Sequence, residues 1–254
     1  MIEIPARAIE AMLAAYFLPF VRILALVASA PVLGHRAIAA RVKVGLAALV
    51  TLIVAPTLSA PAVPLASAAG LTLILEQVLV GLALGFTLRL ITAAIELAGE
   101  IIGLQMGLSF AGFFDPASSG AGTPVGAWLS MFTTLMFLAM NGHLLVLYGV
   151  VESFNVFPLA PDALVAADWR RLAALGTELF RIGLYVALPV IAAMLVCNLG
   201  LGVLARVAPQ LNVLAVGFPI SLLVGMVILV VALPFIGQYI EGTLARGFEL
   251  MLRR

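Results

Sequence analysis

The sequence predicts an all-α integral membrane protein with about six hydrophobic helical segments, broken and kinked, that end in a helical hairpin. Of its 254 residues, 64% are hydrophobic and only 10% are charged, and the mean hydropathy is +1.24. A soluble domain is about half apolar and about a quarter charged, so this chain lacks the polar side chains to cover a globule in water. The apolar residues come in runs near the roughly 20 residues that a membrane helix needs.

Composition also excludes several classes of function. A net charge of +1 gives no basic surface for nucleic acid. The single cysteine, Cys197, and the two histidines, His35 and His143, are too few for a disulfide framework or a metal site within one chain. The chain has no Gly-Lys-Ser/Thr phosphate loop, and no nucleophile elbow surrounds Ser109. We therefore expect no metal, no cofactor and no enzymatic activity.

The first half of the chain contains three hydrophobic segments. The first, at about residues 11–33, is interrupted by Pro19 and Arg22, so we expect it to be kinked. Arg22 also interrupts the apolar run that a signal peptide needs, so we expect the segment not to be cleaved off. A basic cluster follows, and the positive-inside tendency places it in the cytoplasm. The second segment, at about 44–55, is short, and the third runs from about Gly70 to Gly107, which is long for one span. The basic cluster consists of His35, Arg36, Arg41 and Lys43.

The second half contains three more segments. The fourth is expected at about 125–151, with an interruption at Asn141-Gly142-His143. Residues 152–177 are the most water-compatible and predict a loop with a short interfacial helix. The fifth and sixth segments, at about 178–205 and 213–240, form a hairpin about a polar turn and are followed by an amphipathic tail to the C-terminus. Prolines interrupt both of these segments, which favours bends.

Charged residues share one face of the third segment. At 100° per residue, Glu96, Glu100, Gly103 and Gly107 all lie within about 40° of Arg89. Charges at membrane depth usually face a bundle interior or water and find partners. Three interpretations stay open: the stripe meets charges of a partner subunit, lines a wet lumen, or relays protons. A proton relay would require a carboxylate with a raised pKa.

The stretch from Gly99 to Pro124 organises the chain. Gly99, Gly103 and Gly107 recur every fourth residue, which lets a neighbouring backbone approach closely. A loop of aromatic and small residues follows. A non-helical segment with glycine and proline is tolerated at membrane depth only where protein buries it or where it lines a cavity. The stretch therefore predicts a pore or gate element, or else a tight loop between two helices. The candidate pore residues are Phe110, Gly112, Phe113, Phe114, Asp115, Pro116, Gly120 and Gly122.

Two stretches carry a resemblance to a known family. One is Glu-Ile-Ile-Gly-Leu-Gln-Met-Gly-Leu-Ser-Phe at 100–110, followed by Asp115-Pro116 and by Asn141-Gly142-His143. The other is Arg-Val-Ala-Pro-Gln-Leu-Asn at 206–212, followed by Gly217-Phe218-Pro219. Together they resemble the FliR family, the R subunit of the bacterial flagellar type III export gate, and more distantly the T subunit of virulence injectisomes.

The resemblance implies a function and a set of partners. FliR proteins assemble with FliP and FliQ in the inner membrane, beside FlhA and FlhB, into the gate that passes unfolded flagellar subunits outward. It implies a FliP-like part at 1–177, with a plug loop at 107–124, and a FliQ-like hairpin at 178–254. The residues implied in subunit packing are Gly99, Gly103, Gly107, Arg206, Pro209, Gln210, Asn212, Gly217, Phe218 and Pro219.

Two alternatives to the flagellar gate remain at this point. One is the injectisome T subunit, because that family shares the pattern more distantly. The other is a small-solute or ion transporter built of broken helices, which often shows related halves. No related halves are detectable in this chain.

Overall fold

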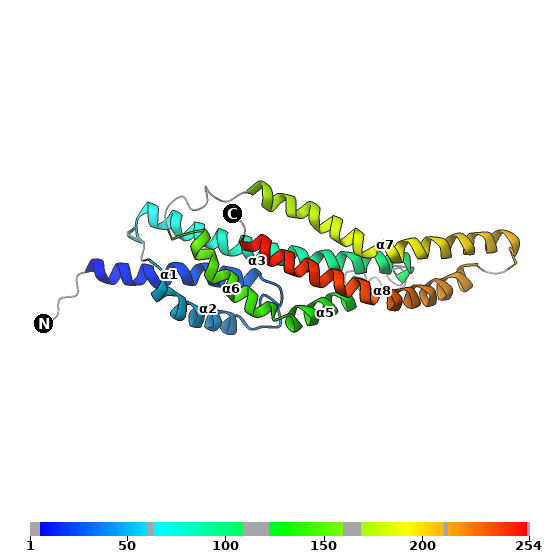
Figure 1. Ribbon diagram of the computed structural model, residues 1–254, viewed down its shortest axis with the longest axis horizontal. Coiled ribbons are helices and arrows are strands. Elements are labelled where there is room, and N and C mark those ends of the chain that lie inside the picture. Colours follow the sequence, from blue (N-terminus) through cyan, green and yellow to red (C-terminus); the bar gives the residue numbers. More distant parts are fainter. Residues whose placement is uncertain (1–5, 60–62, 109–121, 160–168, 211–212, 253–254) are drawn as a thin grey trace. The chain divides into compact units, whose positions relative to one another are not determined.

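The computed structural model describes residues 6–59, 63–108, 122–159, 169–210 and 213–252, and these residues form helices and no strand (Figure 1). Five of the helices are long and apolar enough to cross a membrane, and α5 with α6 would add a sixth as one broken span. The all-α membrane class is therefore confirmed. The elements are α1 Ala6–Ser29, α2 Ala40–Val54, a short 3-10 turn Ala55–Thr57, α3 Ala68–Gln105, α5 Pro124–Ala139, α6 Gly142–Val156, α7 Trp169–Val207 and α8 Val213–Leu252.

Several helices extend beyond the hydrophobic segments that predict them. Helix α2 begins at Ala40, so Arg41 and Lys43 of the basic cluster lie in its first turn, whereas His35 and Arg36 precede it. Helix α7 begins at Trp169, within the stretch predicted as a loop with a short interfacial helix. Helix α8 continues to Leu252, so the predicted tail is part of the same helix. The predicted boundaries were wrong here because hydropathy marks the part of a helix that lipid can surround, whereas backbone hydrogen bonding continues through charged residues.

Helices α5 and α6 are separated by a short break at the place the sequence predicts. Asn141 precedes α6 in the left-handed conformation, with φ of 55°, and Gly142 begins the helix. Asparagine tolerates this conformation better than most residues because its short side chain bonds locally. The interruption in the fourth hydrophobic segment is thus a single residue in the left-handed conformation between two helices.

The chain divides into two compact units, each assembled from separated segments. The first comprises Met1–Leu90, Asn141–Leu175 and Leu244–Arg254, and the second comprises Ile91–Met140 and Gly176–Thr243. Helices α3, α7 and α8 each contribute to both units.

In the first unit, α1 packs against α2 and against the first half of α3. The close approach to α3 depends on two glycines. A Cβ atom on Gly81 would overlap the carbonyl oxygen of Arg22, and one on Gly85 would overlap the side chain of Ser29. The two helices therefore pack nearly backbone to backbone, as small residues permit in membrane bundles.

In the second unit, α7 and α8 form an antiparallel hairpin that packs against the end of α3. Tyr185 on α7 stacks on Tyr239 on α8, with ring centroids 4.8 Å apart. A Cβ on Gly183 would lie 2.9 Å from the carbonyl oxygen of Ala94 on α3, so α7 also approaches α3 closely. Figure 1 shows α7 changing direction within its yellow section. A helix-interior proline, here Pro189, is a usual cause of such a bend.

Up to Ile240, helix α8 is apolar on nearly all sides, yet only one side is buried in the chain. Residues at a spacing of three or four are buried, and those between them are largely exposed. Small residues occupy the buried side near its start, which lets α3 approach, and Gly225 there contacts Met106. The buried stripe consists of Gly217, Ser221, Gly225, Leu229, Ala232, Ile236 and Ile240.

Candidate functional site

The C-terminus of α3 leads into residues 109–121. The Gly107 N–H donates to the carbonyl of Leu104 over 3.0 Å, and Gly107 has a φ of +81°. This is the left-handed residue that commonly ends a helix, and glycine adopts it without steric cost. The chain therefore exits α3 with a defined direction at Gly107.

The next described residue is Gly122, which has a φ of +72°. Thr123 then caps α5: its Oγ1 accepts the Gly126 N–H over 3.1 Å. Pro124 occupies the first helical turn, where its missing N–H costs nothing. Both ends of the 109–121 stretch are thus set by a glycine with positive φ beside a helix terminus.

Glu100 joins the end of α3 to the start of α5. Its carboxylate accepts the Thr123 N–H, with both Oε1 and Oε2 at 2.9 Å from the nitrogen. Thr123 Oγ1 in turn donates to the carbonyl of Gly99 over 3.3 Å. A carboxylate also suits this place because helix N-termini carry partial positive charge. We call Gly99, Glu100, Gly103, Gly122, Thr123 and Gly126 the α3–α5 junction.

Glycines make the junction possible. A Cβ on Gly99 would lie 2.6 Å from the Cα of Gly126, and one on Gly103 would lie 2.6 Å from the Cβ of Thr123. Real Cβ atoms do not approach that closely, so any larger residue would separate the helices. The neighbour that comes close to the glycine face at Gly99 and Gly103 is α5 of the same chain.

The predicted charged stripe has residues in different environments. Arg89 and Glu96 are exposed in the chain, whereas Glu100 is half-buried and bonded to Thr123. The stripe thus presents exposed charges of both signs on α3 and one half-buried carboxylate that bonds Thr123.

Most of the candidate pore residues lie outside the described part of the chain. Only Gly122 is described, and a Cβ on it would lie 2.6 Å from Glu100 Oε1. The others are Phe110, Gly112, Phe113, Phe114, Asp115, Pro116 and Gly120.

The candidate packing residues divide into buried and exposed sets. Gly99, Gly103 and Gly217 are buried within the chain, and Gly107 is half-buried. Asn212 lies outside the described residues. The remaining members gather at the turn between α7 and α8 and at the start of α8, and all are exposed: Arg206, Pro209, Gln210, Phe218 and Pro219.

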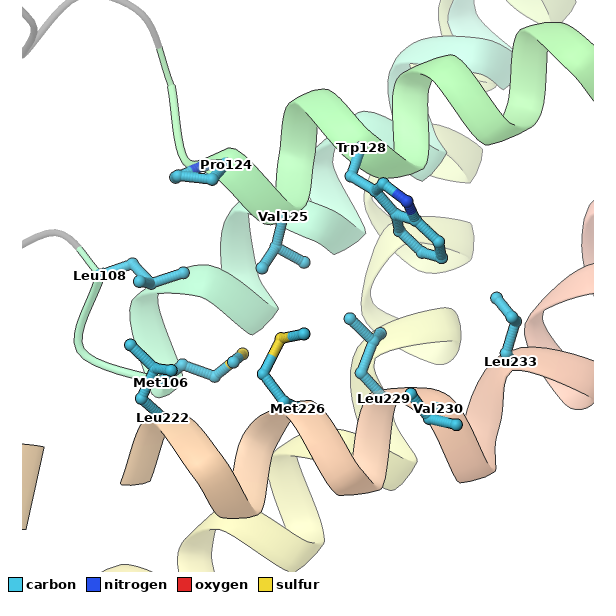
Figure 2. Close-up of a pocket in the computed structure, with 10 residues that line it drawn as sticks. All are labelled: Met106, Leu108, Pro124, Val125, Trp128, Leu222, Met226, Leu229, Val230 and Leu233. Carbon is cyan, nitrogen blue, oxygen red and sulfur yellow. The ribbon is translucent and has the colours of Figure 1, made fainter. Parts of the chain in front are cut away.

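An apolar pocket of about 420 Å³ lies beside the junction, between α3, α5 and α8 (Figure 2). Val125 and Trp128 from α5 face Met226 and Leu229 from α8 across it. Its rim includes Leu108 and Pro124, the described residues near the two ends of the 109–121 stretch. The complete lining is Met106, Leu108, Pro124, Val125, Trp128, Leu222, Met226, Leu229, Val230 and Leu233.

The first unit contains a buried arginine whose role the sequence analysis did not identify. Arg22 on α1 is fully buried. It donates from Nε to Gln77 Oε1 (2.8 Å), from Nη1 to the Ser153 carbonyl (2.9 Å) and hydroxyl (3.3 Å), and from Nη2 to the Phe157 carbonyl (2.7 Å). Its guanidinium lies 4.2 Å from the centre of the Phe154 ring. One side chain therefore ties together α1, α3 and the C-terminal end of α6.

The position of Arg22 follows from the needs of a helix end in an apolar setting. The last carbonyls of a helix lack intrahelical partners and carry partial negative charge, so a cation there is favourable. The signal was present in the sequence, because a charge inside an apolar helix implies buried acceptors. Nothing in the sequence identified α6 as the helix that provides them.

The fold and these sites define a multi-span helical membrane protein whose helices pack through small residues and buried polar clamps. The model of the family described as bacterial export proteins, family 1, matches residues 13–247. The chain belongs to the FliR family of bacterial export proteins.

Several curated relatives share most of this chain. It is 44% identical to the flagellar biosynthetic protein FliR of Pectobacterium carotovorum subsp. carotovorum and 42% identical to that of Escherichia coli K12, in each case over 93% of this chain and 90% of the relative. It is 30% identical to FliR of Bacillus subtilis 168 over 93% of both chains. The resemblance to the FliR family is thus confirmed along nearly the whole length.

Proposed function

We propose that this chain is a core subunit of the flagellar type III export gate. It would form, with FliP- and FliQ-type subunits in the inner membrane, the channel through which unfolded flagellar subunits leave the cell. The identity to FliR proteins over 93% of the chain carries the proposal. FlhA- and FlhB-type export proteins would be its neighbours. The energy for export would come from the proton-motive force or from a separate ATPase.

The exposed end of the α7–α8 hairpin supports a role in an assembly. Beyond Met194 the remainder of α7 is mostly exposed, and its apolar side chains include Val196 at 70% and Val207 at 76% exposure. The polar turn at Arg206, Pro209 and Gln210 lies at the same end of the hairpin. Lipid could cover an apolar helix but would not pair with this turn, so we assign the hairpin end to contact with partner subunits. We further propose that residues 1–177 form a FliP-like part and residues 178–254 a FliQ-like hairpin.

Within this function, residues 107–124 would form the plug of the closed gate. Phe110, Phe113 and Phe114 would supply the apolar constriction, and the glycines would allow it to move. The left-handed Gly107 and Gly122 support this role because each sets the direction of the backbone beside a helix end that borders this segment. The exposed Arg89 and Glu96 would pair with charges of partner subunits.

Co-purification tests the assembly. The tagged chain is expressed alone and together with the FliP- and FliQ-type proteins of the same genome, then extracted in detergent. A large mixed complex that forms only on co-expression is the expected result. A well-behaved single protein that takes up neither partner would contradict the proposal and would favour solute transport.

A deletion tests the plug. Removing residues 111–122 from the assembled complex should make cells permeable to small ions, because the closed constriction is lost. Unchanged permeability, with normal amounts of complex, would exclude the plug role.

Substituting Glu96 by Ala tests the charge pairing, and is expected to lower the yield of complex. If assembly survives while export slows, a role in the lumen or in proton transfer replaces pairing.

A further inference from the structure

The N-terminus of α5 has an incomplete cap within its own sequence. In a capping box the cap residue accepts the N–H of the third helical residue, and a Glu or Gln at that third position accepts the cap residue's N–H in return. Thr123 makes the first of these bonds to Gly126. Gly126 has no side chain, so it cannot make the second.

The missing acceptor comes from another helix. Glu100, on α3, accepts the Thr123 N–H with both carboxylate oxygens at 2.9 Å. A Cβ on Gly126 would overlap Glu100 Oε1, so the glycine at the third position also makes room for the incoming carboxylate. Gly99 contacts Gly126 directly and brings the two helices close enough for this exchange.

We propose that Glu100 is a positioning residue for the plug: its carboxylate completes the cap of α5 from α3 and thereby fixes the start of α5, to which the plug segment connects. The effect of Glu100 on the gate rests on the proposed plug function, whereas the contact between Glu100 and Thr123 does not depend on it. It predicts that the charge of Glu100 acts within the chain, at Thr123, and that the exposed Glu96 one turn earlier does not share this role.

The local effect is measured by hydrogen–deuterium exchange of the full chain in nanodiscs, followed on peptides that cover residues 122–130. Glu100→Gln keeps the size of the side chain and removes its charge. Hydrogen bonds to a charged group are roughly twice as strong as neutral ones, so exchange at the start of α5 should become about tenfold faster. Glu96→Gln removes the same charge from an exposed site of the same helix and should leave these peptides unchanged.

A second variant disturbs the contact between Glu100 and Thr123 from α5 instead of α3. Gly126→Ala keeps both glutamates but places a methyl group where Glu100 Oε1 lies. It should reproduce the faster exchange of Glu100→Gln. Thr123→Ser keeps the N–H and the hydroxyl and should behave as the parent chain. If Glu100→Gln exchanges at the parent rate, the proposal is overturned.

Ion permeability of the assembled gate separates positioning from stability. At matched amounts of complex, Glu100→Gln should raise the leak, and Glu241→Gln, at an exposed site on α8, should not. If the deletion of 111–122 leaks but Glu100→Gln exchanges faster without leaking, Glu100 does not position the plug and the inference fails. If neither leaks while Glu100→Gln still exchanges faster, the plug function fails and the cap from α3 stands.

Discussion

Replacing Arg22 by Met should destabilise the chain by about 3 kcal/mol. The substitution keeps an apolar stem and removes four hydrogen bonds. The carbonyl of Ser153 still accepts the Phe157 N–H over 2.8 Å, so the acceptors left without a bond are the Phe157 carbonyl and Gln77 Oε1. Each stranded buried acceptor costs about 1–3 kcal/mol, and the lost contact with the Phe154 ring adds about 0.5–2 kcal/mol. Relief of the buried charge offsets part of this sum.

The assay is the apparent melting temperature in detergent, read by size-exclusion chromatography after heating. For a chain of this size about 1 kcal/mol corresponds to 2–4 °C, so Arg22→Met should melt about 6–12 °C lower. Arg41→Met removes an exposed positive charge and should change stability by less than about 0.5 kcal/mol. Adding Gln77→Leu to Arg22→Met removes one stranded acceptor and should restore about 1 kcal/mol. A melting temperature for Arg22→Met that matches Arg41→Met would refute the clamp.

Three further substitutions, with Gly200→Ala as a control, test the packing of the second unit. Gly103→Ala should lower stability by about 1–3 kcal/mol because its methyl group would collide with Thr123, whereas Gly200→Ala, in open space on α7, should raise it by up to about 1 kcal/mol. The same melting assay is used for both variants. If both substitutions shift the melting temperature in the same direction, the close α3–α5 contact is contradicted. Gly107→Ala should cost about 1–2 kcal/mol because an L-residue is strained at a φ of +81°, and increased protease cleavage after α3 would report it. Tyr239→Ala should cost at least about 0.5–1.5 kcal/mol through the lost stack on Tyr185, and an unchanged melting temperature would show that the ring contact contributes nothing.

Much of the fold was readable from hydropathy, as the third segment shows. Its apolar run has no break between Gly70 and Gly107, and the structure forms one 38-residue helix over nearly that range. The ends of helices were less readable. At α8 the continuous apolar run ends near Ile240 but the helix continues to Leu252, because the backbone needs no lipid to remain helical.

The candidate site was predicted in position but not in pairing. The spacing of Gly99 and Gly103 predicts a close helix neighbour, but 3.6-residue periodicity contains no information on which helix that is. Glu100 appeared as one member of a charged face, and its acceptor role toward Thr123 depends on the crossing of α3 with α5. Arg22 appeared as an interruption of an apolar segment, and its acceptors lie 131 and 135 residues away in the chain.

The sequence by itself determined the membrane class, the helical segments, the break at Asn141 and the family, because these depend on composition and on local patterns. Only the tertiary structure decided which side of α8 is buried, which helix supplies the cap of α5 and which helix end Arg22 holds. The physical reason is the same in each case. An apolar helix can bury any of its faces, and a polar group can bond any partner, until a close backbone contact at glycine fixes which partner is within reach.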